Sequence, residues 1–102
     1  MEANINEIQA LDVVEQALRA GRLARVNVTY GGQNGDLADP VNYTATDAEV
    51  KAYVTEAVRS GGVPGLRADA RADFSEYVVD RFAPTEARPF ALLQLRPKTP
   101  FG

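Results

Sequence analysis

The side chains that most often carry catalysis are missing from this sequence. Its 102 residues include no His and no Cys. This excludes disulfides, thiolate nucleophiles, zinc sites built from Cys and His, and imidazole general bases. An enzyme would have to rely on carboxylates, and the sequence shows no pair of acids placed as in a hydrolase cleft. We therefore expect a protein that is not an enzyme and that binds no cofactor or metal.

Two local clusters could suggest ligand binding, and each has a simpler interpretation. Asp36, Asp39 and Asp47 lie near one another but match no calcium-loop spacing. Asp47 fits the first turn of a helix, where negative charge meets the helix dipole. The Gly-Gly-Gln-Asn-Gly run at 31–35 lacks the Lys-Ser/Thr of a phosphate-binding loop, and no helix follows it directly. We interpret this run as the tip of a hairpin, because Asn-Gly favours tight hairpin turns.

Composition and charge narrow the remaining classes of protein. The hydrophobic fraction is 45% and the charged fraction 25%, which are ordinary values for one globular domain. The net charge of −3 argues against a nucleic-acid binder, which would carry a basic stripe. No stretch approaches the roughly 18 apolar residues of a membrane span, and the polar start at 1–4 differs from a signal peptide. We expect a cytoplasmic protein of bacterial origin that has no nucleic-acid or membrane partner.

Two amphipathic helices are predicted from apolar residues at helical spacing. The first covers about residues 5–20 and closes at Gly21. The second covers about residues 47–60, and Thr46 with Glu49 forms a capping box at its start. The apolar stripes consist of Ile5, Ile8, Leu11, Val14 and Leu18 in the first helix, and of Val50, Tyr53, Val54, Ala57 and Val58 in the second.

Four strands are predicted from alternation and from apolar runs. Residues 23–30 alternate as a half-buried strand, and we expect them to pair with a short strand at 41–45 across a long polar tip at 31–40. Residues 74–82 are also typical of a strand. The nearly continuous apolar run at 90–95 indicates a central strand that is covered on at least one face.

The order of these elements predicts an α+β fold of the β-grasp type, in which one helix packs across a mixed sheet. The last strand would lie in the sheet interior, beside the first and parallel to it. The expected organisation is an accessory helix at 1–21, a β-grasp domain at 22–95 and an extended tail at 96–102. A different small α+β sandwich is the alternative. The accessory helix would cover the open sheet face or its edge, or else dock a partner or a second copy.

From Leu23 to Gly102 the chain resembles the ubiquitin-like modifier family, and its bacterial members most of all. The resemblance rests on the order of elements and on the ending, where the Leu-Leu-Gln-Leu-Arg run at 92–96 leads into an extended basic tail that finishes at Gly102. The tail departs from the family pattern in two ways. It ends in Phe-Gly instead of a Gly-Gly pair, and Pro97 and Pro100 stiffen it.

The resemblance implies a protein modifier that partner enzymes activate at Gly102 and conjugate to target proteins. A glycine without a Cβ would let the tail approach a narrow active site closely. Arg96, Lys98 and Phe101 would bind the partner, since a basic tail on an acidic body can steer into an acidic groove. The implied partners are activating and conjugating enzymes, target proteins, and a processing peptidase if the chain is trimmed from a precursor.

Two other functions fit the same features. The chain could be a β-grasp binding module or adaptor subunit that is never conjugated. It could also be a sulfur carrier, which likewise activates a terminal glycine. The sequence leaves both open beside the modifier.

Overall fold

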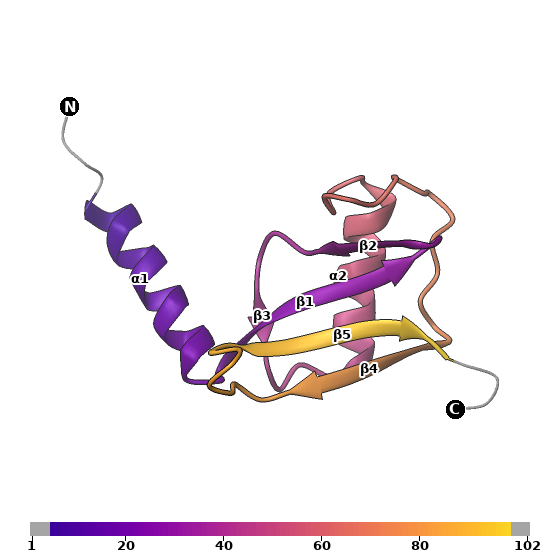
Figure 1. Ribbon diagram of the computed structural model, residues 1–102. Helices are drawn as coiled ribbons and strands as arrows, with labels where there is room; N and C mark the ends of the chain where they lie inside the picture. The colour runs from indigo at the N-terminus through magenta and orange to yellow at the C-terminus, as the bar shows by residue number, and fades with distance from the viewer. Residues whose placement is uncertain (1–4, 99–102) are drawn as a thin grey trace.

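The computed structural model describes residues 5–98, and for residues 5–11 it describes only the path of the backbone. This part of the chain forms an α+β fold (Figure 1). The elements in chain order are α1 (Ile5–Arg19), β1 (Leu23–Tyr30), β2 (Gln33–Asp36), β3 (Val41–Asn42), α2 (Asp47–Arg59), β4 (Tyr77–Phe82) and β5 (Ala91–Pro97). No helix among the described residues is long and apolar enough to cross a bilayer.

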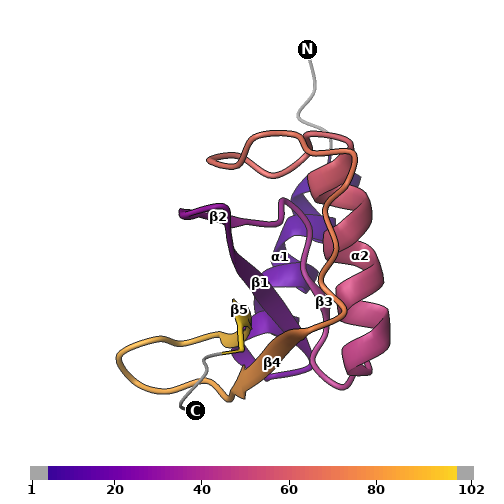
Figure 2. The same ribbon diagram turned by 90° about the vertical axis from the view of Figure 1, so that its right-hand side faces the viewer.

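The strands form one mixed sheet in the order β2-β1-β5-β4, and β3 pairs with the start of β1 beyond the end of β2. The central pair, β1 and β5, is parallel, whereas β2 and β4 pair with it antiparallel. The prediction that the last strand lies inside the sheet, parallel to the first, is confirmed. This arrangement is compatible with a β-grasp fold. Figure 2 shows α2 lying across one face of the sheet.

The core lies between α2 and the face of the sheet that α2 covers. Alternate residues of β1 and β5 point into it, because side chains along a strand alternate between the two faces. One face of α2 supplies valines at helical spacing, as its sequence predicts, whereas Tyr53 of the predicted stripe is 46% exposed. The central side chains, all at most 1% exposed, are Val26, Val28, Val50, Val54, Val58, Phe74, Leu93 and Leu95.

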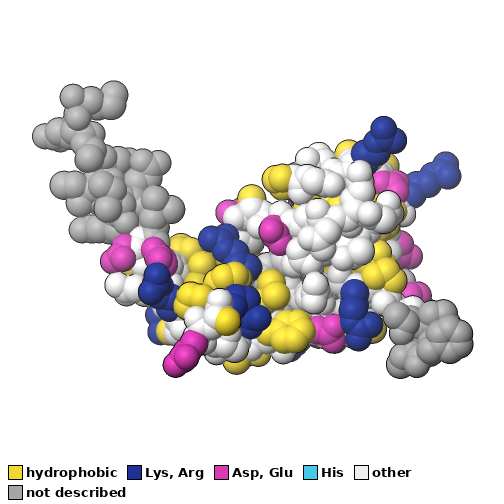
Figure 3. Space-filling view, viewed as in Figure 1, with side chains coloured by type: hydrophobic (Ala, Val, Ile, Leu, Met, Phe, Trp, Pro, Cys, Tyr) yellow, Lys and Arg dark blue, Asp and Glu magenta, His cyan; other side chains and the backbone are white. Residues whose placement is uncertain are grey.

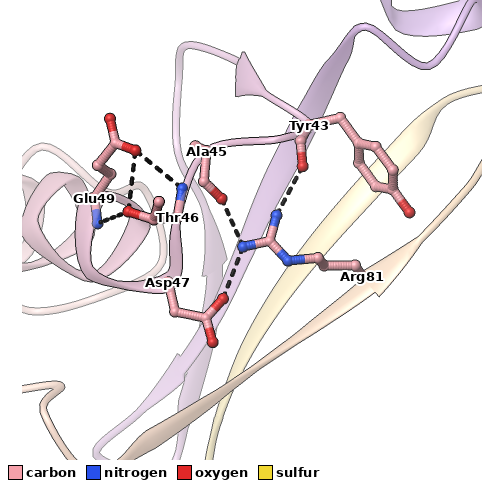
Figure 4. A network of polar contacts seen from close by, with 6 residues as sticks. All are labelled: Tyr43, Ala45, Thr46, Asp47, Glu49 and Arg81. Carbon is pink, nitrogen blue, oxygen red and sulfur yellow. Dashed lines mark hydrogen bonds and ion pairs between the residues drawn. The ribbon is translucent and has the colours of Figure 1, made fainter.

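Both ends of α2 are closed as predicted. The Glu49 N–H donates to Thr46 Oγ1 at 3.1 Å, and the Thr46 N–H donates back to Glu49 Oε1 at 3.0 Å (Figure 4). The pKa of Glu49 is lowered, because the Thr46 N–H and the Thr46 hydroxyl both donate to its carboxylate and favour the ionised form. At the other end Gly61, with φ +76°, donates to Val58 O, and Gly62 donates to Ala57 O. These two bonds form a Schellman motif.

The first hairpin differs from the predicted one. The chain turns at Gly31 and Gly32, and the strand that pairs with β1 is Gln33–Asp36, inside the segment expected to be a polar tip. Both glycines have positive φ, +59° and +76°, as a two-residue hairpin turn requires. Gly35 is not part of the turn. It lets β2 pack closely against the segment at Pro64, since a Cβ on Gly35 would lie 2.5 Å from the carbonyl oxygen of Pro64. The predicted strand at 41–45 shrinks to the two residues of β3.

The last two strands are shifted relative to prediction. β4 begins at Tyr77 instead of Phe74, and Phe74 is buried in the core ahead of the strand. β5 continues through Arg96 and Pro97, two residues that the sequence analysis placed in the tail. The cause is pairing with β4, because Val78 lies opposite Arg96 and extends the antiparallel ladder.

α1 does not cover the sheet, contrary to the expectation for the accessory helix. It projects from the end of the sheet at which β1 starts (Figure 1). Among its described side chains only Ala17 and Leu18, in its last turn, are buried. A second Schellman motif closes it, since Gly21 donates to Leu18 O and Arg22 donates to Ala17 O. The face of the sheet opposite α2 is therefore left open by α1.

Replacing Leu93 with Ala tests whether β5 is a core strand. Leu93 is fully buried, so its truncation removes apolar contacts and leaves a cavity, and we expect a loss of about 2–5 kcal/mol in the free energy of unfolding. Leu92→Ala is the matched control. Leu92 faces the open side of the sheet, and its truncation should cost about 1 kcal/mol. Urea denaturation of both variants measures the difference, and equal losses would contradict the assignment of the two faces.

Replacing Thr46 tests the cap of α2. Thr46→Ala removes the acceptor for the Glu49 N–H and should cost about 0.5–2 kcal/mol. Thr46→Asp retains an acceptor at the same place and should leave the unfolding midpoint nearly unchanged. Thermal unfolding of both proteins provides the comparison. A midpoint that falls as far with Asp as with Ala would show that the side-chain cap is not the source of the stability.

Candidate functional site

The predicted site for activation and partner binding begins at the end of β5. Arg96 lies within the strand, and Lys98 follows the strand with an exposed side chain. Phe101 and Gly102 lie outside the described residues. Of the four residues assigned to activation and partner binding, the structure therefore places two, and these two have different surroundings.

Arg96 forms an ion pair with Asp80 of the neighbouring strand β4. Its Nε donates to Asp80 Oδ2 at 2.6 Å, and the two side chains are 43% and 30% exposed. The pair joins β5 to β4 on the open face of the sheet. An acidic partner would have to compete with Asp80 for this guanidinium, whereas the exposed Lys98 has no such ion pair with a described carboxylate. The charge available to a partner at the start of the tail is therefore centred on Lys98.

The end of the sheet from which the tail leaves is held by aromatic side chains. Phe74 packs against Tyr77 and Tyr30, with ring centroids 4.7 and 5.1 Å apart. The Tyr77 hydroxyl donates to Thr29 O at 2.8 Å, which ties the start of β4 to the end of β1. Burial raises the pKa of Tyr77. The last residue of β5, Pro97, lies opposite Tyr77, so the tail starts from this anchored end.

A hydrogen bond between Tyr30 and Asp69 fixes the long segment that precedes β4. The Tyr30 hydroxyl donates to Asp69 Oδ2 at 2.6 Å across 39 positions of sequence. The bond raises the pKa of Tyr30 and holds that of Asp69 below its ordinary value, because it favours the neutral phenol and the ionised carboxylate. The Arg71 N–H also donates to Asp69, at 2.9 Å, and supports the lowered pKa.

Arg81 joins β4 to the start of α2 on the covered face of the sheet. Its guanidinium donates to Tyr43 O at 2.7 Å, to Ala45 O at 2.6 Å and to Asp47 Oδ1 at 2.7 Å (Figure 4). Two of these acceptors belong to the segment that leads into α2, so one side chain satisfies carbonyls that the short β3 leaves unpaired. The role of Arg81 is structural. Asp47, in the first turn of α2, therefore also forms an ion pair with Arg81.

The side chains on the open face of the sheet form rows, and each row runs across the strands. Strand register places the members of each row opposite one another. The first row is Arg25, Leu92 and Phe82 near the start of β1, and the middle row is Asp36, Asn27, Gln94 and Asp80. Nearer the tail, Asn34 lies opposite Thr29, and Arg96 lies opposite Val78.

The middle row is a ladder of hydrogen bonds centred on Asn27. The Asn27 side-chain amide donates to Asn34 Oδ1 at 2.8 Å and to Asp36 Oδ1 at 2.9 Å. Its oxygen accepts from Asn34 at 3.0 Å and from Gln94 at 3.2 Å. The ladder links β2, β1 and β5, so most of the open face is polar and already satisfied within the chain.

The first row is different, because it combines apolar side chains with a cation, and the segment between β4 and β5 adds Arg88 and Phe90 beside it. Arg88 stacks over the rings of Phe82 and Phe90, at 5.6 and 5.9 Å from their centroids. Phe82 is 40% exposed. Figure 3 shows these yellow and dark blue side chains beside the foot of α1. We call this surface the arginine–aromatic patch, and it consists of Arg25, Phe82, Arg88, Phe90 and Leu92.

Among the described residues, the guanidinium groups of the patch form hydrogen bonds with backbone carbonyls only. Arg25 reaches Ala38 O at 3.4 Å, and Arg88 donates to Ala83 O at 2.8 Å and to Phe90 O at 3.1 Å. Neither forms an ion pair with a described carboxylate. Their positive charge is therefore open to an external acid.

Sequence reasoning missed this patch. Alternation in β1 does place Arg25 on the side away from the core, and the same rule places Leu92 there. What brings them together with Phe82 is the register of three strands, of which β4 comes more than forty positions after β1. No local pattern carries that information.

No metal site is found among the described residues, since no three of their carboxylates come together. Comparison with known proteins gives no further guide, because no family model, no curated protein and no solved structure matches the chain.

Replacing Asp69 with Asn tests the Tyr30–Asp69 bond through its pH dependence. The pKa of Asp69 is lowered by folding, so its contribution to stability is present above the unfolded pKa, near 3.8, and is lost as pH falls through the lower folded value. The native protein should therefore be more stable than Asp69→Asn at neutral pH, and the gap should shrink below about pH 4. Tyr30→Phe should behave in the same way.

The measurement is a series of urea unfolding curves from pH 7 to strongly acid pH. Asp39→Asn is the control, because Asp39 is exposed and makes no hydrogen bond among the described residues. Other carboxylates titrate alike in all the proteins, so the difference between curves isolates Asp69. A gap between native and Asp69→Asn that stays constant with pH would contradict the assignment.

Proposed function

We propose that this chain is a ubiquitin-like protein modifier, which a partner enzyme activates at Gly102 and a second enzyme attaches to target proteins. The observation that carries the proposal is the place of β5. It is an interior strand, paired with β1 on one side and β4 on the other, and it runs to Pro97 at the anchored end of the sheet. A tail that follows such a strand can be pulled into a partner without fraying the sheet, because unpairing β5 would break two ladders.

The chemistry assigned to the chain is limited to its carboxylate. The Gly102 carboxylate would attack ATP and displace pyrophosphate, which forms an acyl adenylate. A thiol of the partner enzyme would then displace AMP to form a thioester. A target amine would finally displace the thiol and form an amide. The thiols belong to the partners, since this chain has no Cys.

The length of the tail sets the geometry of the partner site. Residues 98–102 follow the last paired residue, and fully extended they reach at most about 18 Å. The activating enzyme would need a channel of that depth, with acidic groups for Lys98 near its mouth and a pocket for Phe101. The proposal requires a free carboxylate at Gly102, which a processing peptidase would expose in a longer precursor. The proposal also places the reaction in the cytoplasm, which supplies ATP.

A binding module that is never conjugated is the second candidate function, and the arginine–aromatic patch favours it. Phe82 is exposed, and the guanidinium groups of Arg25 and Arg88 form no ion pair with a described carboxylate. Aromatic and Arg side chains are types that concentrate binding energy at protein interfaces. A modifier also needs a surface that partners recognise. The patch therefore supports binding whether the chain is a modifier or a binding module, and only the chemistry at Gly102 distinguishes these two functions.

Deleting Gly102 is the decisive test of the modifier. The purified chain is mixed with ATP and a candidate activating enzyme, and a thioester is detected as an adduct that reductant or hydroxylamine cleaves. We expect the deletion to abolish the adduct and to leave the thermal midpoint nearly unchanged, because strand pairing ends at Pro97. If the deleted chain forms the adduct as well as the intact one, the modifier proposal fails and the binding module takes its place.

Charge reversal at Lys98 tests how the tail is recognised. Lys98→Glu should slow adduct formation, and more so at low salt, because steering between exposed charges is screened over about 10 Å at 0.1 M. Arg22→Glu is the matched control, since Arg22 is an exposed cation at the opposite end of the sheet. Mass spectrometry of the tail separates the sulfur carrier, because exchange of a Gly102 oxygen for sulfur would give a thiocarboxylate and no amide with a target.

A further inference from the structure

A groove beside α2 is left open by the described residues. It lies between α2 and the segment at 37–42, which contains β3 (Figure 1). Its volume is about 590 Å³, and the apolar side chains that line it include Leu37, Val41, Tyr53 and Ala57. Tyr53 is 46% exposed, although its spacing places it beside the buried stripe of the helix. The groove therefore presents an aromatic ring and apolar surface to solvent.

One face of α2 forms a wall of this groove over about three turns. Glu49, Tyr53, Glu56 and Ser60 line the groove in succession, three or four positions apart, so they share one side of the helix. Eleven residues separate the first from the last, which is about 16 Å along the helix axis. The groove is thus long enough for a segment of a partner chain.

The groove carries negative charge. Its lining includes the carboxylates of Asp39, Glu49 and Glu56 and no Lys or Arg. None of the three forms an ion pair among the described residues. The capping box uses only one oxygen of Glu49, because both Thr46 donors meet Oε1. The lowered pKa of Glu49 keeps this carboxylate ionised at neutral pH.

The two cations of α2 are bound on another side of the helix. Lys51 and Arg59 each donate, at 3.0 Å, to a carbonyl of the segment that precedes β4. From the open face of the sheet, Arg25 reaches a carbonyl at the rim of the groove, but it forms no ion pair with Asp39. The negative charge of the α2 wall is therefore available to a cationic partner.

We propose that this groove binds a basic amphipathic helix of a partner protein, in which two Arg or Lys residues seven positions apart flank apolar side chains. Glu49 and Glu56 are themselves seven positions apart, about 10.5 Å along α2, and nearly two full turns bring them to the same face. A helix lying along α2 would place one cation at each carboxylate and its apolar side chains over Tyr53.

The inference does not depend on the proposed function. No described residue that lines the groove belongs to β4, to β5 or to the start of the tail. A chain that is never activated at Gly102 could still bind the helix, and a chain that binds no helix could still be activated.

The test uses synthetic peptides of about 20 residues, because shorter isolated helices are marginal in water. The basic peptide is alanine-based and carries two arginines seven positions apart with two leucines between them. One control peptide has glutamates in place of the arginines, and another has alanines in place of the leucines. Isothermal titration calorimetry measures each dissociation constant. We expect the basic peptide to bind, each control to bind about tenfold or more weakly, and added salt to weaken binding by screening.

A charge exchange locates the contact. Glu56→Lys changes an exposed side chain, so it should weaken binding of the basic peptide about tenfold without lowering the thermal midpoint. A peptide in which glutamate replaces one arginine should recover affinity for this variant, because the ion pair is restored in reverse. Glu86→Lys is the matched control. Glu86 is an exposed acid between β4 and β5, outside the groove, and its reversal should leave binding unchanged.

Three results would overturn the proposal. The first is a basic peptide that does not bind at about 1 mM, and the second is a control peptide that binds as tightly as the basic one. The third is equal affinity of Glu56→Lys and Glu86→Lys for the basic peptide. Sedimentation equilibrium adds a separate check, because self-association of the native chain that Glu56→Lys abolishes would identify a second copy as the occupant instead.

Discussion

The apolar face shared by β1 and β5 is the constraint on which the rest of the structure depends. Val26 lies opposite Leu93 and Val28 opposite Leu95, and all four side chains are fully buried. Parallel strands cannot be joined by a short turn, so the chain between them has to cross the sheet, and α2 makes that crossing. The burial of α2 on this face follows from the same pairing, because neither surface can be left in water without cost.

The other contacts hold the long connections of that crossing in place. Arg81 binds the segment that enters α2, and the Tyr30–Asp69 bond with the Phe74 ring holds the segment that leaves it. Both sets are polar or aromatic contacts between residues far apart in sequence. They hold two irregular segments against the rest of the fold.

The two ends of the sheet offer different possibilities for binding. At one end β5 passes into the tail, where the chemistry of a modifier would take place. At the other end lies the arginine–aromatic patch, beside the foot of α1. The polar ladder around Asn27 separates the two, and its side chains are already hydrogen-bonded to one another.

What the sequence by itself determined was local. Helix α2, its capping box at Thr46, the glycines that close the helices, the alternation of β1 and the apolar run of β5 all depend on residues within a few positions of each other. The hairpin register, the length of β5 and the direction of α1 were decided by tertiary structure. Gly31 and Gly32 form the hairpin turn in place of a later turn, Val78 extends the ladder at Arg96, and burial of Ala17 and Leu18 holds the last turn of α1. Each of these outcomes depends on residues brought together only by folding, and an apolar stripe does not specify which surface will cover it.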